Sequence, residues 1–214
     1  MNITEAVKTI VENIAADNDG KHWDFIVSGY AGKQMVAYQS MREDLSICID
    51  AANKLQTAKL DGTITTSLFY TIIILYGKCF ADATKAKYPK LEIKDCFKAT
   101  DSRLLDTHKI LIDARNTLVA HRGDSVNDVG VAYLKIQTEN GSRQFRVRQR
   151  RQRKPNNQDL IKYIELFKHL INVVEIKFEK AGIKVWGHMT KDFTPKQFAQ
   201  LRFAGPDKPT LIKD

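Results

Sequence analysis

The sequence has few of the residues that cross-link small folds or break a chain into disordered tracts. Its three cysteines, Cys48, Cys79 and Cys96, are odd in number and widely spaced. No CxxC pair and no Cys/His spacing typical of a metal site is present, so we expect reduced structural thiols and no metal or other cofactor. Only five prolines and eleven glycines occur among 214 residues, which argues against long disordered segments.

Long apolar runs are scarce as well. The first fourteen residues interleave charged and polar residues with apolar ones, so no secretory signal is expected. Residues 62–77 carry no charge, but this stretch is rich in Thr and Ser and too short to span a membrane. We therefore expect a cytoplasmic protein without a membrane partner.

Negative charge is also in deficit. Lys and Arg number 34 against 25 Asp and Glu, which gives a formal net charge of +9. Such an excess suggests a polyanionic partner, although a basic protein without any nucleic-acid role is the alternative. With 43% hydrophobic and 28% charged residues, the chain is expected to be globular and to bury a proper core.

Helical spacing of apolar residues recurs along most of the chain. It predicts a mainly α fold, a bundle of about five helices over residues 1–182 with an inserted basic β-hairpin near 130–150, at about 129–154 with its flanks. The helices are expected at 3–16, 33–58, 65–83, 104–124 and 156–182, with Thr65 or Thr66 capping the third and Gly182 closing the last. The tail, 183–214, is expected to hold a short helix from Thr194 that packs on the bundle.

The chain is organised around residues 104–124. On an ideal α-helix, Arg115 falls within an apolar arc of leucines, and His108 lies beside it. Since an unpaired buried charge costs several kcal/mol, Arg115 needs a partner. A buried acid such as Asp44 or Asp82 would make Arg115 a structural residue. His108 is expected to be a satisfied core residue.

The run Asp113-Ala114-Arg115-Asn116-Thr117-Leu118-Val119-Ala120-His121-Arg122 resembles the RxxxxxH signature of the HEPN superfamily, and it is most similar to the branch related to abortive-infection proteins. The likeness is close over these ten residues and looser over 33–122. It implies a HEPN-type helical bundle acting as a metal-independent endoribonuclease, in a toxin or anti-phage defence system. Some family members carry a modifiable tyrosine two residues after the histidine. Here Gly123 stands at that position, so silencing by that route is not expected, although another antitoxin protein stays possible.

The resemblance places catalysis on Arg115, Asn116 and His121. His121 can exchange protons near neutral pH, and the Arg115 guanidinium can contact phosphate oxygens. In one α-helix these two side chains would be about 120° and about 9 Å apart. A homodimer in which two such helices face each other removes this difficulty. Alternatively, His121 merely interacts favourably with the helix dipole.

A basic β-hairpin is predicted after the motif. Asn140-Gly141 is a type I′ turn signal, and a turn there would pair Ile136 with Phe145 and Leu134 with Val147. Alternation then puts Ala132, Leu134, Ile136, Phe145 and Val147 on one face. Candidate RNA contacts are Tyr133, Lys135, Arg146, Arg148, Arg150 and Arg151. The alternative is a solvated outer face.

Three functions therefore compete. The first is the HEPN-type endoribonuclease, a homodimer with RNA as its substrate. The second is a catalytically inactive HEPN domain that binds RNA or scaffolds proteins. The third is a basic helical-bundle protein that binds DNA, which predicts no preference for the 2′-OH.

Overall fold

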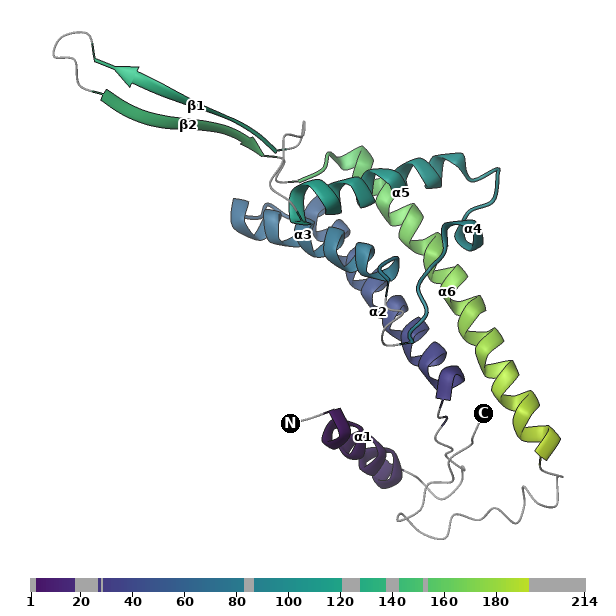
Figure 1. The fold of residues 1–214 in the computed structure, drawn as a ribbon. Coiled ribbons are helices and arrows are strands. Elements are labelled where there is room, and N and C mark those ends of the chain that lie inside the picture. The colour runs from purple at the N-terminus through teal and green to yellow at the C-terminus, as the bar shows by residue number, and fades with distance from the viewer. Residues whose placement is uncertain are drawn as a thin grey trace. The chain divides into compact units, whose positions relative to one another are not determined.

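The computed structural model describes residues 3–17, 27, 29–82, 87–120, 128–137, 143–151 and 154–192. The fold is mainly α with one two-stranded antiparallel sheet, as predicted (Figure 1). Its elements are α1 (Ile3–Asp17), α2 (Gly29–Thr57), α3 (Gly62–Cys79), α4 (Ile93–Cys96), α5 (Ser102–Ala114), the π-helix η2 (Arg115–Ala120), β1 (Asp128–Ile136), β2 (Arg143–Arg151) and α6 (Asn157–Asp192).

The chain forms two compact units. Unit 1 comprises residues 1–39, 83–89 and 175–214, and unit 2 comprises 40–82 and 90–174. Helices α2 and α6 each contribute to both units. Within unit 1, the Lys33 ammonium lies 5.4 Å from the ring centroid of Tyr88, a cation–π distance. All candidate site residues belong to unit 2, which therefore receives most attention below.

Helix α3 is the central element of unit 2. Its β-branched residues would also suit a buried strand, but a segment of this length forms a helix, here 18 residues long. Phe69, Ile72, Ile73 and Tyr76 are buried completely or nearly so. On α2, the Cys48 thiol donates a hydrogen bond to the Ile72 carbonyl (3.6 Å). The apolar character of this helix thus reflects burial in the core of unit 2.

A hydrogen-bonded aromatic cluster joins α3 to α5 and α6. The Tyr76 hydroxyl and His108 Nδ1 are 2.7 Å apart. The rings of Phe80 and Phe97 lie 4.5 and 5.3 Å from that of His108, and Phe167 lies 5.5 Å from Tyr76. Burial and, to a lesser degree, the nearby Lys109 charge lower the pKa of His108, so its ring is neutral at pH 7. The prediction that His108 is a satisfied core residue is confirmed.

All three cysteines are free and buried, as expected for structural thiols. Burial raises the pKa of the Cys48 thiol, and it raises that of Cys79 to about 12. Both thiols therefore stay protonated at neutral pH and behave as small apolar side chains.

The start of α3 and the end of α6 differ from expectation. Asp61, rather than Thr65 or Thr66, caps α3, because its carboxylate accepts hydrogen bonds from the amides of Thr63 (2.6 Å) and Ile64 (3.0 Å). Helix α6 does not stop at Gly182 but continues to Asp192. A glycine inside a helix costs only about 1 kcal/mol, so it does not end one by itself. The short helix predicted from Thr194 lies outside the described residues.

The hairpin forms with a pairing register different from the predicted one. Leu134 pairs with Phe145 and Ala132 with Val147, so each strand position meets a residue two places away from its expected partner. The strands end at Ile136 and begin again at Arg143, and the predicted turn at Asn140-Gly141 lies outside the described residues. Because the shift is by two residues, every side chain keeps its predicted face.

Candidate functional site

The prediction that the α-helix continues through Arg115 is wrong. Helix α5 ends at Ala114, and residues Arg115–Ala120 form a π-helix. The Thr117 hydroxyl donates to the Asp113 carbonyl at 2.9 Å, a side-chain bond of the kind that bends helices. In a π-helix residues five apart are bonded rather than four apart, so the angle and rise calculated for an α-helix do not apply. Such segments are rare and occur frequently at functional sites.

The side chain of Arg115 packs against α3 at Gly77. A Cβ atom added to Gly77 would stand 2.3 Å from Arg115 Cδ, 3.0 Å from its Nε and 3.2 Å from its Cγ. These are the nearest atoms that such a Cβ would meet, so the missing side chain of Gly77 makes the room in which the Arg115 stem lies. The sequence did not reveal this contact, because a glycine inside an apolar run carries no sign of what packs on it.

The acid expected to pair with Arg115 has another partner. Asp44 is buried, but its Oδ2 lies 2.8 Å from Nζ of Lys78. The other candidate, Asp82, is exposed and therefore not a buried acid. Within the described part of the chain, no hydrogen bond or ion pair is assigned to the side chain of the half-buried Arg115. The guanidinium is thus suited to an anion that the described residues do not supply.

Of the other two motif residues, the structure describes Asn116 but not His121. Asn116 follows Arg115 in η2 and is exposed. His121 lies outside the described residues, so its convergence with Arg115, within one chain or between two, stays a prediction. The expected helix end at Arg122 and Gly123 also lies outside them.

One face of the hairpin is basic. Strand pairing sets Arg146 opposite Tyr133, Arg148 opposite Val131 and Arg150 opposite Val129. With Lys135 and Tyr133, these three arginines form what we call the basic face. The Arg146 guanidinium donates to Gln144 Oε1 at 2.7 and 3.2 Å, and the arginines are exposed while Tyr133 is half-buried. Alternate residues lie about 7 Å apart along a strand, so the cations form a regular row.

Arg151 is the last residue of β2, and its position pairs with Asp128. Its contact with RNA stays a prediction.

The opposite side of the hairpin is the apolar face, formed by Ala132, Leu134, Ile136, Phe145 and Val147 as predicted. All five side chains are exposed, and Phe145 retains 89% of its accessible surface. The face that carries the cations also holds the exposed Val129 and Val131, so the two faces differ in charge more than in apolar content.

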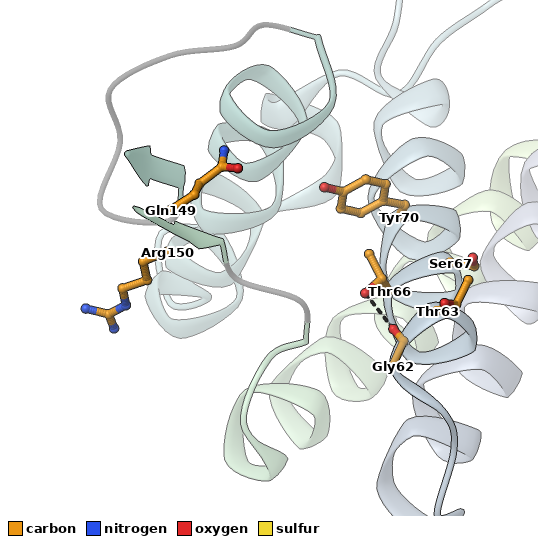
Figure 2. A pocket seen from close by; sticks show the side chains of 7 residues that line it. All are labelled: Gly62, Thr63, Thr66, Ser67, Tyr70, Gln149 and Arg150. Atoms are coloured by element: carbon orange, nitrogen blue, oxygen red, sulfur yellow. Dashed lines mark hydrogen bonds between the residues drawn. The ribbon is translucent and has the colours of Figure 1, made fainter. Parts of the chain in front are cut away.

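A polar cavity lies beside the hairpin. It has a volume of about 830 Å³ and is lined by Gly62, Thr63, Thr66, Ser67, Tyr70, Gln149 and Arg150. Figure 2 shows Tyr70 pointing from α3 towards the strand that carries Gln149, with Arg150 directed away from α3. Four of these residues, Thr63, Thr66, Ser67 and Tyr70, carry hydroxyl groups, and the sequence analysis did not predict them as a group. Their spacing, i, i+3, i+4 and i+7 from Thr63, was the available signal.

In the described ranges, no three His, Cys, Asp or Glu side chains are grouped so that they could hold a metal ion. Among the helices that the structure describes, none combines the length and apolarity needed to cross a membrane. Comparisons with protein-family models, curated proteins and solved structures find no match. The likeness to HEPN proteins therefore stays a prediction from the motif.

Proposed function

We propose that the protein is a metal-independent endoribonuclease of the HEPN type, with Arg115, Asn116 and His121 completing a composite site between two copies of the chain. The observation that carries this proposal is the placement of Arg115. Its stem packs on Gly77, while the buried acid Asp44 pairs with Lys78. A permanently charged group held in a half-buried position, without an acid assigned to it, is suited to binding phosphate.

The chemistry follows from the residue types. Cleavage of RNA without a metal requires a base for the 2′-OH, an acid for the leaving oxygen and positive charge beside the developing phosphorane. His121 would move the protons, Arg115 would stabilise the phosphorane, and Asn116 would orient the substrate. The expected product is an RNA end with a 2′,3′-cyclic phosphate. The biological setting that fits is a toxin or anti-phage effector in the cytoplasm, restrained by an antitoxin protein.

The basic face would hold the substrate. Its exposed cations can contact phosphates, which positions a strand without reading its sequence. The half-buried ring of Tyr133 stands in the same row. Affinity on such a surface should fall steeply with salt, because bound phosphates release counterions.

The test is cleavage of a single-stranded RNA in the presence of a chelator. Wild-type protein should generate cyclic-phosphate ends and leave DNA of the same sequence intact, because DNA has no 2′-OH. His121→Ala should reduce cleavage by about 10²–10⁴-fold, the usual contribution of a general acid–base, while RNA binding survives. Asn116→Ala should have a milder effect. A folded His121→Ala protein that cleaves at the wild-type rate would rule out this assignment.

The second candidate is a catalytically inactive HEPN domain that binds RNA or scaffolds proteins. The basic face favours it, because that face is built entirely from β1 and β2 and needs no contribution from Arg115 or His121. This candidate predicts salt-dependent RNA binding with no cleavage by any variant.

A further inference from the structure

Among the described residues of unit 2, the apolar face of the hairpin is the most exposed group of large apolar side chains. Leu134, Ile136, Val147 and Phe145 retain 45, 55, 70 and 89% of their accessible surface. A two-stranded hairpin without a packed face is at best marginally stable in water. Contiguous apolar surface of this kind usually marks an interaction site. Burial of these side chains against a partner would therefore stabilise the hairpin.

We propose that a second copy of the chain covers it, with the two hairpins stacked apolar face on apolar face and pointing in opposite directions. This contact needs no ribonuclease activity and differs from the meeting of motif segments in the proposed function. Its immediate consequence is a ribbon of two packed sheets that carries a basic face on each outer side.

The distribution of charge favours a second copy as the occupant. Lys135, Arg146 and Arg148 project from the other side of the strands. Face-to-face stacking directs both sets of cations outward into solvent, so no like charges are buried together. An RNA strand on the apolar face would instead leave those cations on the far side, away from its phosphates. Arg143, paired with Ile136 near the tip, is exposed and can stay at the rim of the contact.

The sizes of the side chains also make the face self-complementary. The rows run from Gly130–Gln149 through Ala132–Val147 to Leu134–Phe145. Side chains are thus small on β1 near the base of the hairpin and larger near its tip. Under a two-fold axis that reverses the hairpin direction, the Leu134–Phe145 row lies over the second copy's Ala132–Val147 row. Bulky side chains then meet smaller ones, as packed sheets about 10 Å apart require.

The area sets the expected strength. Nine-residue strands are about 30 Å long and two strands about 10 Å wide, so the face covers only roughly 300 Å². A stable complex usually buries about 800 Å² per partner. The contact is therefore expected to be weak and concentration-dependent, and not a permanent dimer.

The first experiment compares two variants of β2 by sedimentation velocity across a range of protein concentrations. Phe145→Ser/Val147→Ser removes the apolar face, whereas Arg146→Ser/Arg148→Ser changes the intervening residues, which face the other way. The first variant should raise the dissociation constant of self-association about tenfold or more. The matched control should leave that constant unchanged or lower it, because it removes only outward charge.

Cross-linking tests the orientation directly. The native cysteines are buried, so an added surface cysteine should react selectively. A mixture of Leu134→Cys and Ala132→Cys proteins should be joined by a short bis-maleimide. A mixture of Arg146→Cys and Arg148→Cys proteins should not be joined, because these residues lie on the outer faces.

Three results would overturn the proposal: a wild-type protein that stays monomeric at all concentrations, an apolar-face variant that associates like wild type, or cross-links only through the Arg146 and Arg148 positions. If the wild type is monomeric and Phe145→Ser/Val147→Ser loses RNA affinity, the face binds RNA bases instead. A monomeric wild type would contradict the composite nuclease site as well, whereas an apolar-face variant that associates like wild type contradicts only the hairpin contact.

Discussion

Two phenylalanines show how differently the two halves of unit 2 use the same residue type. Phe167 on α6 is completely buried against Tyr76 and Tyr163, whereas Phe145 on β2 retains 89% of its accessible surface. The helical core obtains its stability from side chains that exclude water. The hairpin leaves both of its faces available for other molecules. Stability and recognition are therefore expected to respond to different mutations.

The largest expected effect tests that separation on stability. Phe167→Ala should lower the free energy of unfolding by about 3–5 kcal/mol, because it leaves a cavity among fully buried side chains. Phe145→Ala should change it by less than about 0.5 kcal/mol, as for other exposed positions. Urea unfolding of both variants at low protein concentration, where self-association is absent, measures the difference. Equal losses would mean that the hairpin belongs to the cooperative core.

The contact between Gly77 and Arg115 gives a smaller but sharper effect. In an Arg115→Ala background, Gly77→Ala should raise the free energy of unfolding by up to about 1 kcal/mol, since alanine is the better helix former. With Arg115 present, the new Cβ would meet Cδ of that side chain at 2.3 Å, so the gain should shrink or become a loss.

A double-mutant cycle over Gly77 and Arg115 isolates the term that joins them. We expect a coupling of about 0.5–3 kcal/mol, the range found for residues in contact. Purely additive changes would show that the Arg115 stem does not lie on α3. Because the cycle is measured by unfolding alone, its result does not depend on any nuclease activity.

The smallest effect concerns pH. Burial lowers the pKa of His108 below its ordinary value of 6.5, so the unfolded chain takes up this proton at a higher pH than the folded one. The stabilisation is complete above pH 6.5 and is lost as pH falls from there through the depressed folded value. The melting temperature of wild type should therefore decline on mild acidification, and more steeply than that of His108→Gln. Parallel pH profiles would contradict the buried neutral ring.

The sequence predicted the bundle better than it predicted the site. Period and length identified α3 and α6, and strand alternation assigned the two faces of the hairpin correctly. The predicted register was wrong because it was derived from the local turn signal of Asn140-Gly141 alone, whereas the observed pairing is shifted by two residues.

The Arg115 segment shows a further limit. An apolar pattern with helical period does not distinguish an α-helix from a π-helix, because the difference lies in which carbonyl each amide reaches. The same holds for Gly77 and for the Asp44–Lys78 pair, which depend on packing between elements distant in sequence. The alternative in which Arg115 pairs with Asp44 was reasonable from the sequence, but Asp44 pairs with Lys78 instead.

The most direct measurement of the central claim is single-turnover RNA cleavage as a function of protein concentration and salt. Arg146→Ala/Arg148→Ala/Arg150→Ala should weaken RNA binding and reduce the salt slope by roughly 2, at about 0.7 per lost contact to a single strand. Its cleavage rate at saturation should equal that of wild type. Arg115→Ala should bind normally and lose cleavage by about 10²–10³-fold. A hairpin variant with wild-type affinity, or an Arg115→Ala protein with wild-type cleavage, would contradict the claim that the hairpin binds RNA and the bundle cleaves it.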